Sequence, residues 1–231
     1  LDWKFRDGVS LVPVLDTRGR MVAIASPTND SFTVGSHRVG KDQPTFVIAE
    51  IGNNHQGSVD LAKQLVDLAV EAKADCVKFQ LRDMDALYRG ASGKITAGED
   101  LGAQYTLDLL TRFSLSAPKM IEVFDHCRDK GIDIMCTPWD LPSLEVLLEY
   151  GVDGLKIASA DLTNHALLTA AAKENLPMIV STGMSTEDEI KESVALLRRY
   201  GAPYALLQVQ STYPAPFKDI NLRYMQRLAE I

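Results

Sequence analysis

The sequence predicts an α/β fold: a (β/α)8 barrel of the TIM type, incomplete at its C-terminus and preceded by a short N-terminal β-hairpin segment. From about Thr45 onward, short apolar runs alternate with amphipathic helical patterns, which indicates βα units. The runs are apolar throughout, which is typical of parallel strands covered on both faces. Gly131, Gly151 and Gly201 each follow a helical pattern and precede a strand, where helix-ending glycines belong.

Six apolar runs are the predicted strands of the barrel. They are Phe46–Ile51, Cys76–Gln80, Ile132–Thr137, Gly154–Ser159, Met178–Ser181 and Tyr204–Gln210. The predicted helices between them include Asp60–Ala72, Ser116–Lys130, Ser143–Tyr150 and Glu187–Tyr200. Because a complete barrel contains eight βα units, we expect about six of the eight here. An open parallel sheet is the alternative.

The first part of the chain does not follow this repeat. Val9–Leu15 and Met21–Ala25 flank the turn-forming residues Asp16–Gly19, which predicts a β-hairpin. The string VSLVPVLDTRGRMVAIAS weakly resembles the strand–turn–strand end of a CBS module. We therefore expect residues 1–30 to form an N-terminal hairpin segment and residues 31–231 to form the barrel domain.

A second short strand pair is predicted at the start of the barrel domain. Phe32–Val34 and His37–Val39 precede the first barrel strand and are separated by a two-residue turn. We expect this pair to close the lower end of the barrel.

Composition narrows the class of protein. The 231 residues are 46% hydrophobic and 24% charged, with a net charge of −7. A mildly acidic chain disfavours binding to nucleic acid and to anionic lipid.

Three cysteines without a C-x-x-C pair indicate reduced thiols in a cytoplasmic protein. Leu1–Asp7 has no signal-peptide character, and no apolar run approaches the roughly 20 residues of a membrane helix.

Polar residues gather where the predicted strands end, which in a barrel is the catalytic face. Two of them are lysines inside apolar strands, Lys78 in CVKFQ and Lys156 in GLKIAS. A buried charge is costly unless it is paired or meets a ligand. Glu50 can neutralise only one ammonium group, so the surplus positive charge suits a phosphate or a carboxylate. His55 is predicted either to fix the Asn53–Gly57 turn or to contact a ligand.

The string FVIAEIGNNHQGSVDLAKQLVDLAVEAKADCVKFQ contains the first two predicted barrel strands and the helix between them. It is similar to the opening βαβ unit of the sialic acid synthase family, which includes the legionaminate and pseudaminate synthases. CTPWD, GLKIASADLTN, MIVSTGMST and QSTYPAPFKDINL follow in the family's order, and ordered motifs are more specific than a single one. The resemblance implies a transferase that condenses phosphoenolpyruvate with an amino-sugar aldehyde such as N-acetylmannosamine.

The resemblance also implies the role of individual residues. Glu50 and Lys78 match the catalytic pair, in which the acid steers protons and the lysine lies beside the phosphate. Thr137, Lys156 and Ser181 match the groups that hold the carboxylate of phosphoenolpyruvate.

The remaining matches concern the phosphate and the sugar. Ser159 corresponds to a phosphate ligand, and Gln80 and Tyr213 correspond to residues that face the sugar. Asp161 stands where some members have Glu, and Ser211 stands where some have Asn at the phosphate. These two departures bear on the identity of the substrate.

The resemblance implies a divalent metal, Mn or Mg, held by two histidines on a seventh and an eighth strand. This sequence ends before either strand, and none of its four histidines matches those ligands. A homodimer is also implied.

Two other functions remain open from the residues. A lysine in an apolar barrel strand also suits a Schiff-base aldolase. The CBS-like hairpin leaves a non-catalytic ligand-binding or regulatory protein as the third hypothesis.

Overall fold

The computed structural model describes residues 12–15, 21–25, 31–87, 108–212 and 214–231. Within these residues, six parallel strands form one sheet in chain order. They are β5 (Ile48–Gly52), β6 (Cys76–Leu81), β7 (Asp133–Pro138), β8 (Gly154–Ile157), β9 (Met178–Ser181) and β10 (Tyr204–Leu207). Each strand pairs with the next one along the chain, as expected when every right-handed crossover runs in the same direction. The predicted α/β fold is confirmed.

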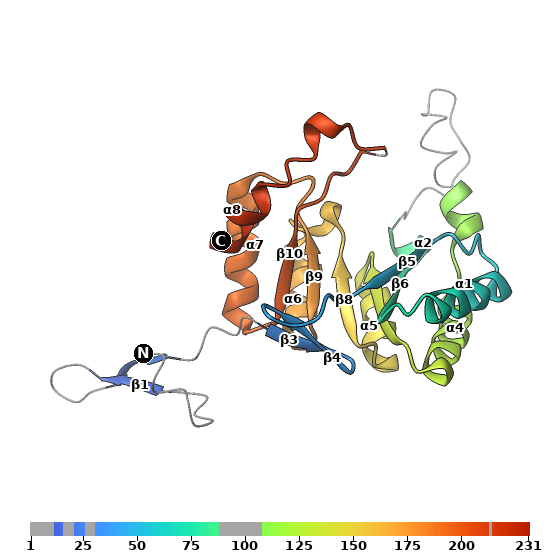
Figure 1. Cartoon of the computed structure of the whole chain (residues 1–231), viewed down its shortest axis with the longest axis horizontal. Helices are drawn as coiled ribbons and strands as arrows, with labels where there is room; N and C mark the ends of the chain where they lie inside the picture. The colour runs from blue at the N-terminus through green and yellow to red at the C-terminus, as the bar shows by residue number, and fades with distance from the viewer. Residues whose placement is uncertain (1–11, 16–20, 26–30, 88–107, 213) are drawn as a thin grey trace.

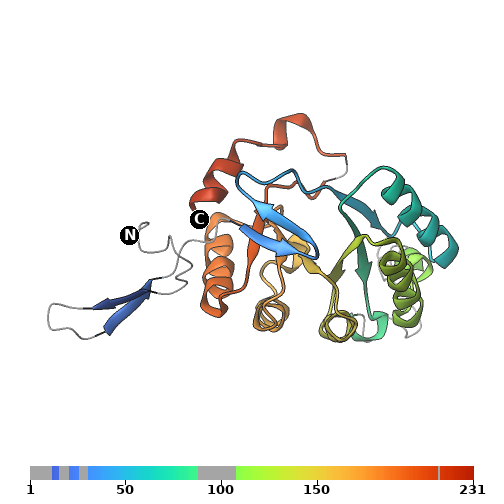
Figure 2. The ribbon, with the colours of Figure 1, turned by 60° about the horizontal axis from the view of Figure 1, so that its bottom comes forward.

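Helices cover the outer face of this sheet. They are α1 (Val59–Glu71), α2 (Met84–Leu87), α4 (Ala117–Lys130), α5 (Leu141–Tyr150), α6 (His165–Lys173), α7 (Glu187–Tyr200) and α8 (Tyr224–Glu230). Figure 1 shows the strands side by side with the helices outside them, and Figure 2 shows helices and sheet bent into an arc. The arrangement is a half-barrel, which agrees with an incomplete barrel of the TIM type.

The helix ends are specified locally by the sequence. Asp140 and Thr186 accept hydrogen bonds from the first turns of α5 and α7, and Thr186 forms a capping box with Glu189. Gly131 and Gly201 end α4 and α7 with positive φ, in space that is open around each glycine. The helices therefore begin and end where the sequence pattern predicts, within two residues.

The main core lies between the sheet and the helices. Phe79 of β6 and Phe124 of α4 are fully buried and meet edge to face, with ring centroids 5.9 Å apart. Leu155 of β8 and Leu168 of α6 continue the same apolar layer. Burial of each such side chain stabilises the fold by about 1.5–3 kcal/mol.

The hairpin of β3 (Ser31–Val34) and β4 (His37–Gly40) closes the amino ends of the strands, as predicted. Val34 packs against Cys76, Met135 and Ile179 in a second apolar cluster. Figure 2 shows this hairpin across the inner side of the arc. The opposite, carboxyl ends of the strands are left as the face for chemistry.

Polar contacts fasten this hairpin to the sheet. The carboxylate of Asp133, the first residue of β7, accepts a hydrogen bond from the Ser36 backbone N–H at 3.1 Å and lies 2.7 Å from Nδ1 of His37. Nε2 of His37 lies 3.4 Å from the carboxylate of Asp75.

The predicted N-terminal hairpin is present. β1 (Val12–Leu15) pairs antiparallel with β2 (Met21–Ala25), and the predicted turn at residues 16–19 lies outside the described residues. The division of the chain at residue 30 stays a prediction. No helix among the described residues is long and apolar enough to span a membrane.

Two strands end earlier than predicted. β8 ends at Ile157, because Ser159–Asp161 turns into a short 3-10 helix rather than continuing the strand. β10 ends at Leu207, three residues earlier than predicted. Both changes lie at carboxyl ends of strands, where backbone that carries polar side chains leaves the sheet.

Candidate active site

The carboxyl ends of the strands surround a cavity of about 650 Å³. It is lined by eight of the ten predicted site residues: Glu50, Lys78, Gln80, Thr137, Lys156, Ser159, Ser181 and Ser211. They come from every strand of the sheet or from the residues directly after it. Parallel strands with one common direction explain why residues so distant in sequence converge.

Lys78 lines this cavity and is held by two neighbouring side chains. Its Nζ lies 2.9 Å from the carboxylate of Glu50 and donates a hydrogen bond of 3.3 Å to the Thr137 hydroxyl. The Lys78 side chain is 8% exposed, whereas that of Glu50 is 57% exposed. The ammonium is therefore held in place by its neighbours, and the carboxylate reaches into the open space.

Lys156 provides the second ammonium group. Its Nζ donates to the Ser181 hydroxyl at 2.5 Å and to the backbone carbonyl of Ile157 at 2.8 Å. Burial, and next the positive charge of Lys78, lower the pKa of Lys156 to about 8. Both lysines line the same cavity, where an anion would relieve their repulsion.

The hydroxyl of Ser159 is held at the same face. It accepts a hydrogen bond of 3.2 Å from the backbone N–H of Gly183, in the loop after β9. A Cβ on Gly183 would lie 2.7 Å from the carbonyl oxygen of Val209. Only glycine permits the β9 and β10 loops to approach this closely.

Gln80 occupies the rim of the cavity beside two residues not predicted as site residues. Its Oε1 accepts hydrogen bonds from Nη2 of Arg82 at 2.7 Å and from Nε1 of Trp139 at 3.3 Å. Trp139 lines the cavity and was visible in the sequence within the CTPWD motif, but only the structure relates it to Gln80.

Two predicted site residues are not among those that line the cavity. Asp161 lies on the 3-10 turn after β8, and its Oδ1 accepts a hydrogen bond from Asn164 at 3.1 Å, while its Oδ2 is buried without a hydrogen-bond partner among the described residues. Burial raises the pKa of Asp161. The structure therefore does not bring Asp161 to the cavity. Tyr213 lies outside the described residues.

His55 fixes a turn, the first of its two predicted roles. The side chain is fully buried, and its Nδ1 accepts a hydrogen bond of 3.1 Å from the Gly57 backbone N–H. It is not among the residues that line the cavity, although its neighbours Asn53 and Asn54 are. The turn presents these two amides to the site.

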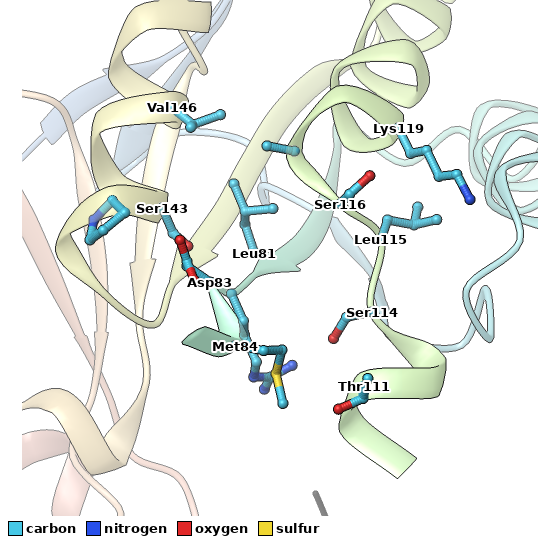
Figure 3. Close-up of a pocket in the computed structure, with 13 residues that line it drawn as sticks. Leu81, Asp83, Met84, Thr111, Ser114, Leu115, Ser116, Lys119, Ser143 and Val146 are labelled. Atoms are coloured by element: carbon cyan, nitrogen blue, oxygen red, sulfur yellow. The ribbon is translucent and has the colours of Figure 1, made fainter. Parts of the chain in front are cut away.

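A second cavity of about 470 Å³ lies outside the strand ends, between the first turns of α4 and α5. Figure 3 shows Leu81, Asp83 and Ser143 on one side of it and Ser114 on the other, with the Lys119 side chain extending away. Neither Lys78 nor Lys156 borders this space. The two predicted lysines therefore belong to the first cavity, whereas Arg82 and Lys119 line the second.

Comparison with known proteins places the chain in a family. The model of the NeuB family matches residues 65–231, which is more than half of the chain. The chain belongs to the NeuB family.

Two relatives named as synthases are similar over most of this chain. The N,N'-diacetyllegionaminic acid synthase of Legionella pneumophila is 34% identical over 200 residues, which cover 83% of this chain and 56% of that protein. The human N-acetylneuraminate-9-phosphate synthase is 31% identical and covered over 54% of its length. The chain thus spans about half the length of the curated relatives it matches.

A solved structure of a sialic acid synthetase has a similar fold. The N-acetylneuraminic acid synthetase of Leptospira borgpetersenii, determined in complex with citrate, superposes with a TM-score of 0.77 at 32% identity. The match covers 87% of this chain and 67% of that one.

The metal site that the sequence resemblance implies is not formed by the described residues. Across the described ranges, no three His, Cys, Asp or Glu side chains come together as metal ligands. His37 and His126 lie against the carboxylates of Asp133 and Asp67, and His55 holds its turn. These residues do not fit a divalent metal centre, and we assign no metal ligand to them.

Proposed function

We propose that the cavity binds phosphoenolpyruvate, and that the protein to which this chain belongs condenses it with an amino-sugar aldehyde such as N-acetylmannosamine. The products are a nine-carbon sugar acid of the sialic acid type and inorganic phosphate, so the enzyme is a transferase that forms a C–C bond. Membership of the NeuB family and the synthase names of the relatives support this proposal.

One observation carries the proposal: two ammonium groups from different strands share one cavity with four hydroxyls. Lys78 has one acidic partner, Glu50, and Lys156 has hydroxyl and carbonyl partners. The pair therefore has positive charge to spare for a small dianion or trianion. Phosphoenolpyruvate carries its carboxylate and its phosphate on the same carbon, C2, which suits two ammonium groups at one site.

The residues divide between the two anionic groups. Lys156, Thr137 and Ser181 hold the carboxylate, while Lys78 and Ser159 hold the phosphate. Ser211 lines the same side of the cavity and adds a hydroxyl donor. We expect catalysis by these residues to be positioning and electrostatic preorganisation, because the carboxylate and the phosphate that they hold are both attached to C2, where charge develops.

The chemical course follows from the substrates. The methylene carbon of phosphoenolpyruvate attacks the aldehyde carbon, and the aldehyde oxygen takes up a proton. Water adds to C2 with loss of a proton, and the C2–O bond of the tetrahedral intermediate then breaks to release phosphate and the 2-keto acid. Glu50, mostly exposed to the cavity, is placed to move these protons. We propose that Mn or Mg is bound by ligands other than the described residues.

The test uses the complete gene product. It is mixed with phosphoenolpyruvate and N-acetylmannosamine, phosphate release is followed, and the nine-carbon acid is identified by mass spectrometry. Calorimetry of phosphoenolpyruvate with the present chain measures the binding step separately. Lys156→Met should abolish binding, whereas Lys173→Met, on the exposed end of α6, should not. Equal binding by both variants would refute the assignment of the cavity.

The pKa of Lys156 favours a second candidate, a Schiff-base aldolase. A lysine with a pKa of about 8 is partly neutral near pH 8 and is then a nucleophile. Borohydride reduction in the presence of pyruvate would trap a Schiff base as a mass increase on Lys156. We expect no adduct, because the hydrogen bonds from Nζ to Ser181 and Ile157 engage Lys156 as a donor. An adduct would replace the first proposal with the second.

We further propose that the protein is a cytoplasmic homodimer. Light scattering during gel filtration should give twice the mass of the complete chain. Fractionation of the source cells should recover the protein with the cytoplasm. A monomer that is fully active would contradict the dimer as the working form.

A further inference from the structure

The two hydrogen-bond donors beside Gln80 determine which way its amide is turned. Its Oε1 accepts from Arg82 at 2.7 Å and from Trp139 at 3.3 Å. A guanidinium group and an indole nitrogen can only donate hydrogen bonds. The amide oxygen must therefore face these two groups, and the NH2 group must face the other way.

The two donors are themselves fixed. The guanidinium carbon of Arg82 lies 4.4 Å from the centre of the Trp139 ring, which is a cation–π contact. The backbone N–H of Trp139 donates to the Leu81 carbonyl at 3.1 Å, and the Asp83 N–H donates to the Asp140 carboxylate at 2.8 Å. The ends of β6 and β7 are thus tied together beneath the pair.

The NH2 group of Gln80 faces a gap that Gly52 leaves open. A Cβ built on Gly52 would lie 3.3 Å from Nε2 of Gln80 and 2.9 Å from Oε1 of Glu50. The two atoms therefore border the same small space at the rim of the cavity. One of them donates hydrogen bonds, and the other, a carboxylate oxygen, accepts them.

A hydroxyl group fits this pair best among the groups of a sugar. It can accept from Nε2 of Gln80 and donate to Oε1 of Glu50 at the same time, whereas an ether oxygen or a methylene group cannot. A site built to bond a hydroxyl rejects the analogue that lacks it, because its polar groups are then left unpaired.

We infer that Arg82 and Trp139 are positioning residues that hold the Gln80 amide with its NH2 toward Glu50, so that the gap beside Gly52 selects a hydroxyl of the aldehyde substrate. The selection of a substrate rests on the proposed function. The positioning itself does not.

The positioning is tested without any reaction. The chain contains two tryptophans, Trp3 and Trp139, so its nitrogen–proton spectrum should show two indole signals. Trp139→Phe identifies the Trp139 signal by its loss. In Gln80→Ala that signal should move to the position of an indole without this acceptor, while the Trp3 signal stays. An unmoved Trp139 signal would overturn the inference.

The selection is tested in the complete gene product with aldehydes that each lack one hydroxyl. The wild type should discriminate roughly 10-fold or more against one member of the set, and Gln80→Ala should lose that discrimination. Trp139→Phe, which keeps a ring beneath Arg82, should raise the KM for the aldehyde several-fold and leave the KM for phosphoenolpyruvate unchanged. Gln226→Ala, on the exposed face of α8, is the matched control.

A double mutant separates positioning from a general structural effect. In the Gln80→Ala background, Trp139→Phe should change the aldehyde KM no further, because the amide that it positions is absent. An equal change in both backgrounds would remove Trp139 from this role. If the wild type has no turnover at all while the indole signal responds to Gln80→Ala, the proposed function fails and the positioning stands.

Discussion

Lys78 and Glu50 are direct partners in the parallel register of β6 and β5, and their charged atoms lie 2.9 Å apart. Their surroundings differ: the lysine is almost fully enclosed and the glutamate is mostly exposed. Loss of the lysine therefore leaves a carboxylate that water can solvate, while loss of the glutamate leaves a buried ammonium. Replacement of Lys78 therefore affects mainly activity, whereas replacement of Glu50 also affects stability.

Lys78→Met should abolish activity without unfolding the protein. Glu50 stays solvated, and the methionine side chain fills much of the buried space. We expect phosphate release to fall at least about 100-fold, the usual effect of removing a group that stabilises developing charge. Thermal unfolding measures the fold in parallel. Undiminished turnover would remove Lys78 from the mechanism.

Binding of phosphoenolpyruvate should depend on pH through Lys156. Its pKa is about 8 in the folded protein, against 10.5 for an ordinary lysine, because of burial and then Lys78. The ammonium form binds the anion, so affinity should fall as the pH rises through 8. Binding at pH 8 should take up protons, which calorimetry in buffers of different ionisation enthalpy measures. Proton uptake that persists in Lys156→Met would assign it to another group.

In the ligand-free protein, Lys156 should contribute a rise in stability with pH. Between pH 8 and 10.5 its side chain binds more protons in the unfolded chain than in the folded one, so its contribution to the free energy of unfolding increases with pH in this window. Lys156→Met should remove this increase. Urea unfolding at pH 8 and pH 10 gives the comparison, and identical slopes in both proteins would contradict the shift.

Gly52→Ala should lower turnover by more than its loss of folding stability explains. Gly52 and Gly131 have φ values of 52° and 69°, so alanine costs about 1–2 kcal/mol of backbone strain at either position. Only at Gly52 does the new methyl group meet Glu50 and Gln80; at Gly131 there is nothing within 4 Å. We expect similar losses of stability and a large loss of turnover in Gly52→Ala alone. Equal activities of the two variants would contradict a close approach at Gly52.

Asp133→Ala should loosen the β3–β4 hairpin at the amino ends of the strands. The change removes the acceptor for the Ser36 backbone N–H and the partner of His37. Hydrogen bonds to a buried charged group contribute about 1.5–3 kcal/mol, so the free energy of unfolding should fall by about 2 kcal/mol. Asp129→Ala, on the exposed side of α4, should stay within about 0.5 kcal/mol of the wild type.

Much of the fold could be predicted from the sequence because its signals are local. Met178–Ser181 and Glu187–Tyr200 have the same bounds in sequence pattern and structure, since apolar period and capping residues define both. The end of β8 was predicted wrongly, because Ser159 leaves the strand in a 3-10 turn that no local signal indicated.

The candidate site was predictable only in part. Lys78 and Lys156 stood out because a charge within an apolar strand needs an explanation. Asp161 had the right residue type and place in the chain, yet its carboxylate faces Asn164. Trp139 and Arg82 gave no comparable signal, because their importance lies in a contact with Gln80 that joins two strands.

By itself, the sequence determined the order of strands and helices and the face on which the polar residues gather. These follow from periodicity, caps and the common direction of parallel strands, which are properties of neighbouring residues. Only the tertiary structure decided which polar atoms meet: Lys78 with Glu50, Lys156 with Ser181, and Gln80 with Arg82 and Trp139. A hydrogen bond requires its donor and acceptor to be placed within a few tenths of an ångström of the ideal separation, and the packed sheet sets that separation for side chains far apart in the chain.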